Sequence, residues 1–139
     1  MREVEMAFSA RAFSPVGVVP VNSDVESVDY RDGALVIVLA GAMDPDRTVH
    51  GLTVTFRDVT GFRLLDEFDL ARYWLSDGFP RGSFVMEVTA GGWSAEEDAL
   101  QGLEKNRREW LVASGNASVS VFCATAPTLV GTMRKFTAD

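Results

Sequence analysis

Cysteine and histidine are nearly absent from this chain of 139 residues, which contains one of each, Cys123 and His50. One cysteine excludes an internal disulfide, and the two residues are too few for a Cys/His zinc centre. A histidine-dependent nucleophile would have to use His50, which precedes a predicted strand without a catalytic motif around it; we interpret it as an exposed or edge-strand residue. Cys123 falls on an apolar strand face, so we interpret it as a core residue. We therefore expect no metal centre, no cofactor and no catalytic residue.

Long hydrophobic runs are also missing. The best run, Ala34 to Met43, has ten residues and includes Gly41, which is the length of a strand and too short for a membrane helix. The first residues carry Arg2, Glu3 and Glu5 in place of the uninterrupted apolar core of a signal peptide. We expect a cytoplasmic protein without a membrane partner.

Positive charge is scarce. Thirteen Lys and Arg residues oppose 20 Asp and Glu residues, and the formal net charge of −7 repels nucleic-acid phosphates and anionic lipids. A phosphate-binding loop is not supported either, because Gly91-Gly92 lacks the Gly and Lys that would follow in such a loop. We expect no nucleic-acid partner, whereas an acidic surface suits a basic protein partner.

The composition is that of one globular domain over residues 1–139, with 47% hydrophobic and 24% charged residues. Alternating apolar residues predict strands. They cover 4–10, 26–30, 35–39, 52–56, 83–88, 110–113 and 118–123, and weaker patterns cover 62–65 and 128–136. The run from Ala34 is apolar on both faces, which predicts a central strand.

Two turns set the register of predicted hairpins. Asp32-Gly33 is typical of a type I′ turn, and Gly115-Asn116 suits a type II′ or I′ turn. The resulting pairs are Tyr30 with Leu35, Val28 with Ile37 and Glu26 with Leu39, then Val112 with Val119 and Trp110 with Val121.

Two segments predict short helices. Leu64, Phe68, Ala71 and Leu75 recur at helical spacing, with Asp66 or Asp69 available as the N-cap. Ser94-Ala95-Glu96-Glu97 matches a capping box and predicts a helix over about 95–105. The predicted fold is mainly β, with α+β as the neighbouring class: an antiparallel sheet or sandwich of six to seven strands with one or two short helices.

Acidic and aromatic side chains gather in both helical segments. Asp69 and Tyr73 share a helix face, and Trp74 can present its indole N–H beside acidic groups, a combination suited to a basic, partly apolar partner. Trp93 precedes a second acidic group at 96–98. The candidate binding residues are Asp66, Glu67, Asp69, Tyr73, Trp74 and Trp93. The competing interpretation is a capped helix whose acids complement its dipole, and whether the two segments meet in space stays open.

Part of the chain resembles a known group of proteins. Val54-Thr55-Phe56-Arg57-Asp58-Val59, followed by Phe62-Arg63, Asp66-Glu67 and Tyr73-Trp74, is similar to a strand-plus-motif of small bacterial domains of unknown function, including immunity proteins of polymorphic toxin systems. The resemblance covers Val49 to Trp74 and Arg108 to Pro127, where Glu109-Trp110-Leu111-Val112 forms a strand. It implies a bacterial, non-enzymatic, mainly β domain that neutralises a partner by binding it.

Two functional hypotheses follow. The first is a small binding protein of the immunity type, with an acidic surface anchored by aromatic residues and a basic partner. The alternative is a small-molecule-binding protein or enzyme with a pocket in a curved sheet, suggested by three Trp and nine Phe residues. Paired carboxylates can act as general acid and base, but spacing in the sequence does not establish their separation, so enzymatic activity stays open. A homo-oligomer through an exposed strand edge, with Val85 and Met86 extending the pairing, is a third hypothesis.

Overall fold

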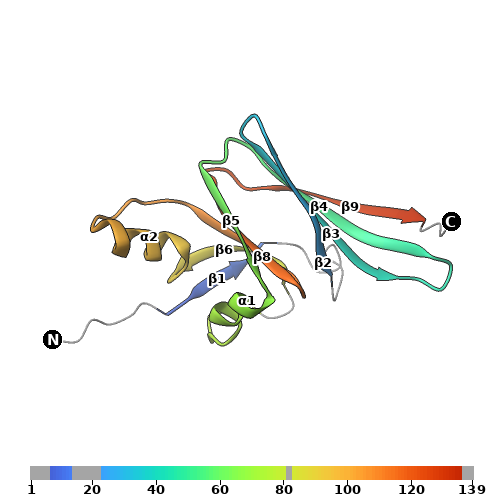
Figure 1. The fold of residues 1–139 in the computed structure, drawn as a ribbon, viewed down its shortest axis with the longest axis horizontal. Helices are drawn as coiled ribbons and strands as arrows, with labels where there is room; N and C mark the ends of the chain where they lie inside the picture. The colour runs from blue at the N-terminus through green and yellow to red at the C-terminus, as the bar shows by residue number, and fades with distance from the viewer. Residues whose placement is uncertain (1–6, 14–22, 81–82, 136–139) are drawn as a thin grey trace.

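Two stacked antiparallel sheets and two short helices make up the computed structural model, which describes residues 7–13, 23–80 and 83–135 (Figure 1). The elements are β1 (Ser9–Ala12), β2 (Asp24–Arg31), β3 (Ala34–Met43), β4 (Thr48–Phe56), β5 (Gly61–Asp66), α1 (Glu67–Trp74), β6 (Val85–Ala90), α2 (Trp93–Gln101), β7 (Glu109–Ala113), β8 (Ala117–Phe122) and β9 (Thr128–Lys135). The predicted class, mainly β with antiparallel pairing and short helices, is confirmed.

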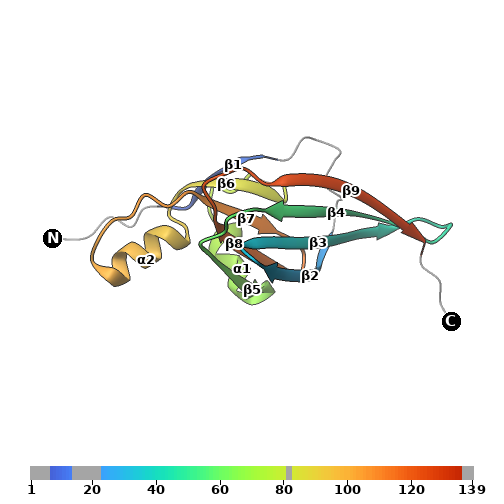
Figure 2. The same ribbon diagram turned by 90° about the horizontal axis from the view of Figure 1, so that it is seen from above.

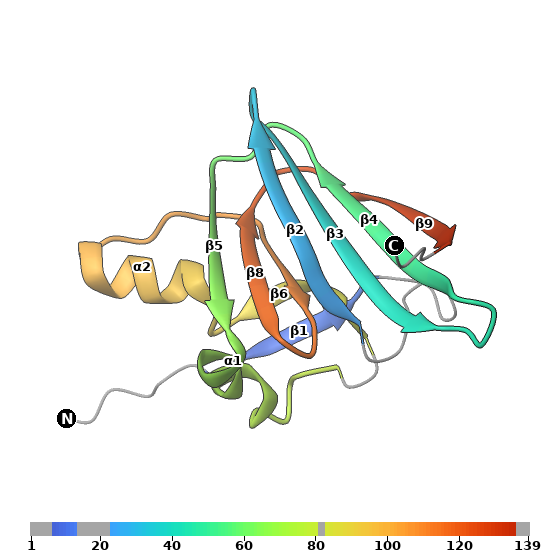
Figure 3. The ribbon, with the colours of Figure 1, turned by 45° about the vertical axis from the view of Figure 1, so that its right-hand side comes forward.

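One sheet has five strands in the order β1-β6-β7-β8-β5, and the other has four in the order β2-β3-β4-β9. The described residues form nine strands, more than the six or seven expected, because the weak patterns at β5 and β9 both find full-length partners in β8 and β4. Figures 2 and 3 show that the β3–β4 hairpin of the four-stranded sheet extends past the five-stranded sheet. As predicted, β3 lies between two strands.

The main core fills the space between the sheets. Its fully buried side chains include Leu35 and Ile37 from β3, Phe56 from β4 and Trp110 from β7. Cys123 belongs to the same cluster, as predicted, and its thiol contacts the carbonyl oxygen of Arg57 at 3.0 Å. Burying these inward faces against each other is the dominant stabilisation of a sandwich.

A second core lies on the opposite face of the five-stranded sheet. Tyr73 of α1 packs there with Phe8, Phe79, Met86 and Leu111. The middle strands β7 and β8 of the five-stranded sheet are therefore buried on both faces, and α1 packs on the outer face of this sheet.

Both predicted hairpins form, with local differences. Tyr30 pairs with Leu35 and Val28 with Ile37, but Val25 takes the place predicted for Glu26 opposite Leu39 because a bulge shifts the register. Asp32 and Gly33 both have positive φ, as a type I′ turn requires. At the second hairpin the predicted pairs, Val112 with Val119 and Trp110 with Val121, are confirmed.

The Gly115-Asn116 loop is neither type I′ nor type II′, since neither residue has a positive φ. Instead, the Asn116 side chain accepts the N–H of Val25 at 2.9 Å and donates to its carbonyl oxygen at 3.3 Å. The loop conformation is thus set by a contact with β2 that is distant in sequence.

Three further predictions need correction or placement. The strand expected over 4–10 begins only at Ser9, and residues 1–6 lie outside the described part of the chain. Val85 and Met86 cannot extend an edge, because both are fully buried in β6, an interior strand between β1 and β7. His50 lies part-exposed in β4, where its Nε2 is 2.6 Å from Asp44 Oδ2.

Among the described helices, none combines the length and apolar character needed to cross a membrane.

Candidate functional site

Helix α1 begins where β5 ends. The carboxylate of Asp66 accepts the backbone N–H groups of Phe68 at 3.1 Å and Asp69 at 3.2 Å, so Asp66 is the N-cap. One of the two caps proposed from the sequence is therefore confirmed. The capped helix therefore follows β5 directly, without an intervening loop.

The apolar residues whose spacing predicted this helix lie on its solvent side. Phe68 is 82% exposed and Leu75 84% exposed, and Ala71 between them is also exposed. Residues at i, i+3 and i+7 share a helix face, so the three form one stripe. A helix on a folded domain usually buries such a stripe, and large apolar side chains that stay exposed together commonly mark an interaction surface.

Acidic side chains border this stripe. Between Asp66 and Asp77 four acids accompany one base, Arg72. Arg72 itself forms ion pairs with Asp69 at 3.5 Å and with Glu96 at 3.3 Å. The charge around the stripe is therefore net negative.

The second helix, α2, depends on a carboxylate from another element. The capping box predicted at Ser94 is wrong: the N-cap is Gly92, which has no side chain, and Ser94 lies inside the helix. Glu109 of β7 takes that role, since its carboxylate accepts the N–H groups of Trp93 at 2.9 Å and Ser94 at 2.8 Å. Burial raises the pKa of Glu109 above its usual value, and the two N–H donors and the charge of Arg63 offset this only in part.

Trp93 secures α2 to the outer face of β5 and β8. Its ring stacks on Phe122 with centroids 4.0 Å apart and planes 13° apart. Gly61 makes room for it, because a Cβ there would lie 3.2 Å from the Phe122 ring and 3.5 Å from Trp93. The guanidinium of Arg63 lies 5.2 Å from the Trp93 ring centre.

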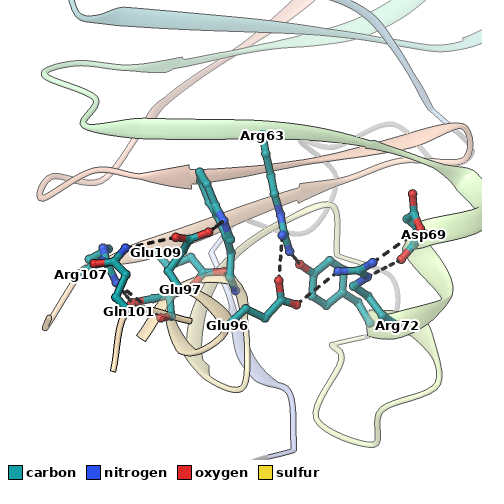
Figure 4. Close-up of polar contacts among 11 residues, drawn as sticks. Arg63, Asp69, Arg72, Glu96, Glu97, Gln101, Arg107 and Glu109 are labelled. Atoms are coloured by element: carbon teal, nitrogen blue, oxygen red, sulfur yellow. Dashed lines mark hydrogen bonds and ion pairs between the residues drawn. The ribbon is translucent and has the colours of Figure 1, made fainter. Parts of the chain in front are cut away.

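The two acidic segments do meet, at Glu96. Arg63 from β5 donates to Glu96 Oε2 at 2.8 Å, and Arg72 from α1 donates to Oε1 at 3.3 Å (Figure 4). The second terminal nitrogen of Arg63 donates to the Tyr73 hydroxyl at 2.8 Å. Burial alone would lower the pKa of Arg63, but its hydrogen bonds to Glu96 and Tyr73 outweigh this and raise it. One carboxylate of α2 thus links α1 to the sheet.

The six candidate residues divide between two roles. Asp66, Glu67, Asp69 and Trp74 are exposed on α1 and border the stripe. Tyr73, at 1% exposure, lies in the second core, and Trp93 belongs to α2 and is stacked on Phe122, so neither is part of the exposed stripe. Sequence reasoning missed Phe68 and Leu75 as surface residues; their shared helical spacing was visible, but spacing does not say which side of a helix faces the sheet.

A hollow of about 460 Å³ opens beside Trp93. Its walls are Thr60, Gly61, Trp93, Glu97, Gln101, Lys105, Arg107 and Phe122. Arg107 lies over Phe122 and is held by Asp98 at 2.7 Å, while Glu97 accepts the indole N–H of Trp93 at 3.2 Å. The polar groups at its rim carry both signs of charge.

Within the described residues, no cluster of three or more His, Cys, Asp or Glu side chains has a geometry that could hold a metal ion. Comparison with protein-family models, with curated proteins and with solved structures found no match.

Proposed function

We propose that this chain is a small non-enzymatic binding protein that captures a basic protein partner through the exposed face of α1. The docking surface consists of Phe68, Ala71 and Leu75, bordered by Asp66, Glu67, Asp69, Trp74 and Asp77. This is the mode of action implied by the resemblance to immunity proteins, in which binding alone neutralises a partner.

The observation that carries the proposal is the outward direction of the apolar stripe. Phe68 and Leu75 together expose two large side chains on a helix whose opposite side already holds the buried Tyr73. Leaving them in water forgoes the free energy of burying them, about 1.5–3 kcal/mol for each. A partner that covers the stripe would recover this free energy.

The charge around the stripe indicates the chemistry of the partner. Glu67 and Asp77 form no ion pair within the described structure, and the chain as a whole carries −7. Long-range electrostatic attraction would therefore speed the approach of a protein with a basic rim, and repulsion would slow the approach of an acidic protein.

The test compares capture by matched surfaces. Wild type, Phe68→Ser, Glu67→Gln/Asp77→Asn and the control Val130→Ser, which changes an exposed residue of β9, are immobilised and exposed to lysate at low and high salt. A protein retained by wild type and by the control, and lost by the other two, is then purified. We expect Phe68→Ser to weaken its Kd about 30-fold, as for an interface residue worth roughly 2 kcal/mol.

The double charge variant should mainly slow association, and its effect should shrink at high salt. Equal retention of every captured protein by wild type and by Phe68→Ser would refute the proposal. A purified partner whose Kd is unchanged by Phe68→Ser but weakened by Val130→Ser would place the interface on the four-stranded sheet instead.

The hollow beside Trp93 supports a second candidate function, the binding of a small molecule. Ring edges of Trp93 and Phe122 offer an apolar wall, while Glu97 and Lys105 offer opposite charges. Titration with free phenylalanine, a zwitterion with an aromatic side chain, would shift the indole N–H resonance of Trp93 if the hollow binds such molecules. A ligand whose Kd is about 10 mM or lower would shift this resonance at a ligand concentration of about 10 mM. The absence of a shift at that concentration would exclude this candidate function for that class of ligand.

A further inference from the structure

β5 is the last strand of the five-stranded sheet, and among the described residues its backbone pairs on one side only, with β8. The pairing runs from Gly61 to Asp66 without a register shift. One row of its N–H and C=O groups therefore faces outward along a straight edge, which is a template for another strand.

The other edge strands of the described sheets are protected in ways that β5 is not. β1 has only four residues and a register shift. β2 carries four charged residues and a bulge. β9 ends in the exposed charged residues Arg134 and Lys135. Short length, charge and bulges are the usual means by which proteins prevent pairing at an edge.

The two charges of β5 do not serve this purpose. Arg63 is directed to the covered face of the sheet, where Glu96 and Tyr73 hold it. Asp66 caps α1. The other face of the strand presents Phe62, 37% exposed, and Leu64, 54% exposed.

These two apolar residues lie where an added strand would cover them. Phe62 pairs with Val121 and Leu64 with Val119, so both point to the core side of the sheet. Tyr30 of β2 contacts Phe62 with ring centroids 5.4 Å apart. Alternate apolar residues of an incoming strand would pack against this open side of the sandwich.

We propose that β5 accepts an extended, basic segment of a partner protein as a sixth strand of the five-stranded sheet. This deepens the proposed function, on which it rests, because β5 leads directly into α1 and its acids. A second copy of this chain is disfavoured as the occupant, because two chains that each carry a net charge of −7 repel each other.

The test uses a capped hexapeptide of alternating lysine and valine, with a hexapeptide of alternating glutamate and valine as its charge-reversed control. Amide hydrogen exchange of the isotope-labelled chain is followed by NMR with and without peptide. We expect the outward-facing amides of residues 61–66 to exchange at least tenfold more slowly with saturating lysine peptide. The glutamate peptide should leave them unchanged.

Two variants locate the site. Leu64→Lys places a charge on the core-side face of β5, where an added strand would pack, and should weaken lysine-peptide binding at least tenfold. Val130→Lys, the matched change on β9, should leave it intact. Both positions are exposed, so both variants should fold. Loss of binding only in Val130→Lys would move strand addition to β9 and overturn the assignment.

The remaining outcomes separate this inference from the proposed function. Strand addition would be overturned by peptide binding without protection of any β5 amide, by equal binding of both peptides, or by no binding. The capture experiment on Phe68 tests the proposed function independently of these outcomes. If light scattering shows a dimer without peptide, and the same amides are protected in that dimer, the choice of partner would be overturned.

Discussion

The backbone N–H of Trp93 donates to Oε2 of Glu109 at 2.9 Å, across sixteen positions of sequence. The N-cap of α2 is glycine, and no residue of α2 is buried, so the helix is held to the sheet by contacts such as this carboxylate, the Trp93–Phe122 stack and the Arg63–Glu96 pair. The Glu96 bridge to α1 in turn depends on α2 staying in place.

Gly92→Ala should destabilise the protein by about 1–3 kcal/mol, the range expected when buried donors lose their acceptor. The added Cβ would lie 2.4 Å from Glu109 Oε2 and must displace it from the helix N-terminus. Urea unfolding measures the effect. Gly131→Ala, where a Cβ meets nothing within 4 Å, is the control and should change the free energy of unfolding little. Equal effects of the two changes on the free energy of unfolding would contradict the contact between Glu109 and the N-terminus of α2.

Burial of Glu109 predicts a pH dependence. Since its pKa is raised in the folded state, the folded chain holds this proton to higher pH than the unfolded chain does, and its contribution to stability falls as pH rises above about 4.5. The free energy of unfolding of wild type minus that of Glu109→Gln should therefore decrease from pH 4 to pH 7. Urea unfolding at a series of pH values would show this. A difference that grows with pH would mean that the N–H donors lower the pKa.

Removing the charge of Arg63 should cost more than removing that of an exposed arginine. Arg63→Met leaves Glu96 without one donor and the Tyr73 hydroxyl without its partner, which we expect to cost about 1–3 kcal/mol. Arg31→Met, at an exposed ion pair with Asp29, should cost less than about 0.5 kcal/mol. Thermal unfolding of both variants provides the comparison, and a smaller effect at Arg63 would argue against its bridging role.

Substituting the stripe should leave the fold intact. Phe68→Ser and Leu75→Ser should each change the free energy of unfolding by less than about 0.5 kcal/mol, because both side chains are already in water. Tyr73→Ala, on the buried side of the same helix, should cost about 3 kcal/mol or more. A loss of more than 1 kcal/mol at Phe68 would indicate that it packs against the domain and is not available to a partner.

Cys123 should be protected from thiol reagents in the folded protein. It is 2% exposed within the main core, so a chromogenic disulfide such as Ellman's reagent should react fully only in denaturant. Rapid labelling of the native protein, at the rate of a free thiol, would show that the core opens there.

Local patterns predicted much of the fold. The alternation in β4, the Asp32-Gly33 turn and the register of the β7–β8 hairpin all follow from residues close together in sequence, and each is confirmed. The failures share a cause. Ser94 looked like an N-cap and Gly115-Asn116 like a primed turn, but the contacts that form at these positions are with Glu109 and Val25, which lie elsewhere in the chain.

The sequence by itself determined the antiparallel β class, the burial of Cys123, the helix after Asp66 and the acidic character of the chain, because side-chain period and charge are local properties. Only the tertiary structure decided that the apolar stripe of α1 faces solvent and that β5 ends a sheet. Helical spacing defines a face but not its direction, and strand order depends on which distant segments pack together. Those two facts carry both proposals.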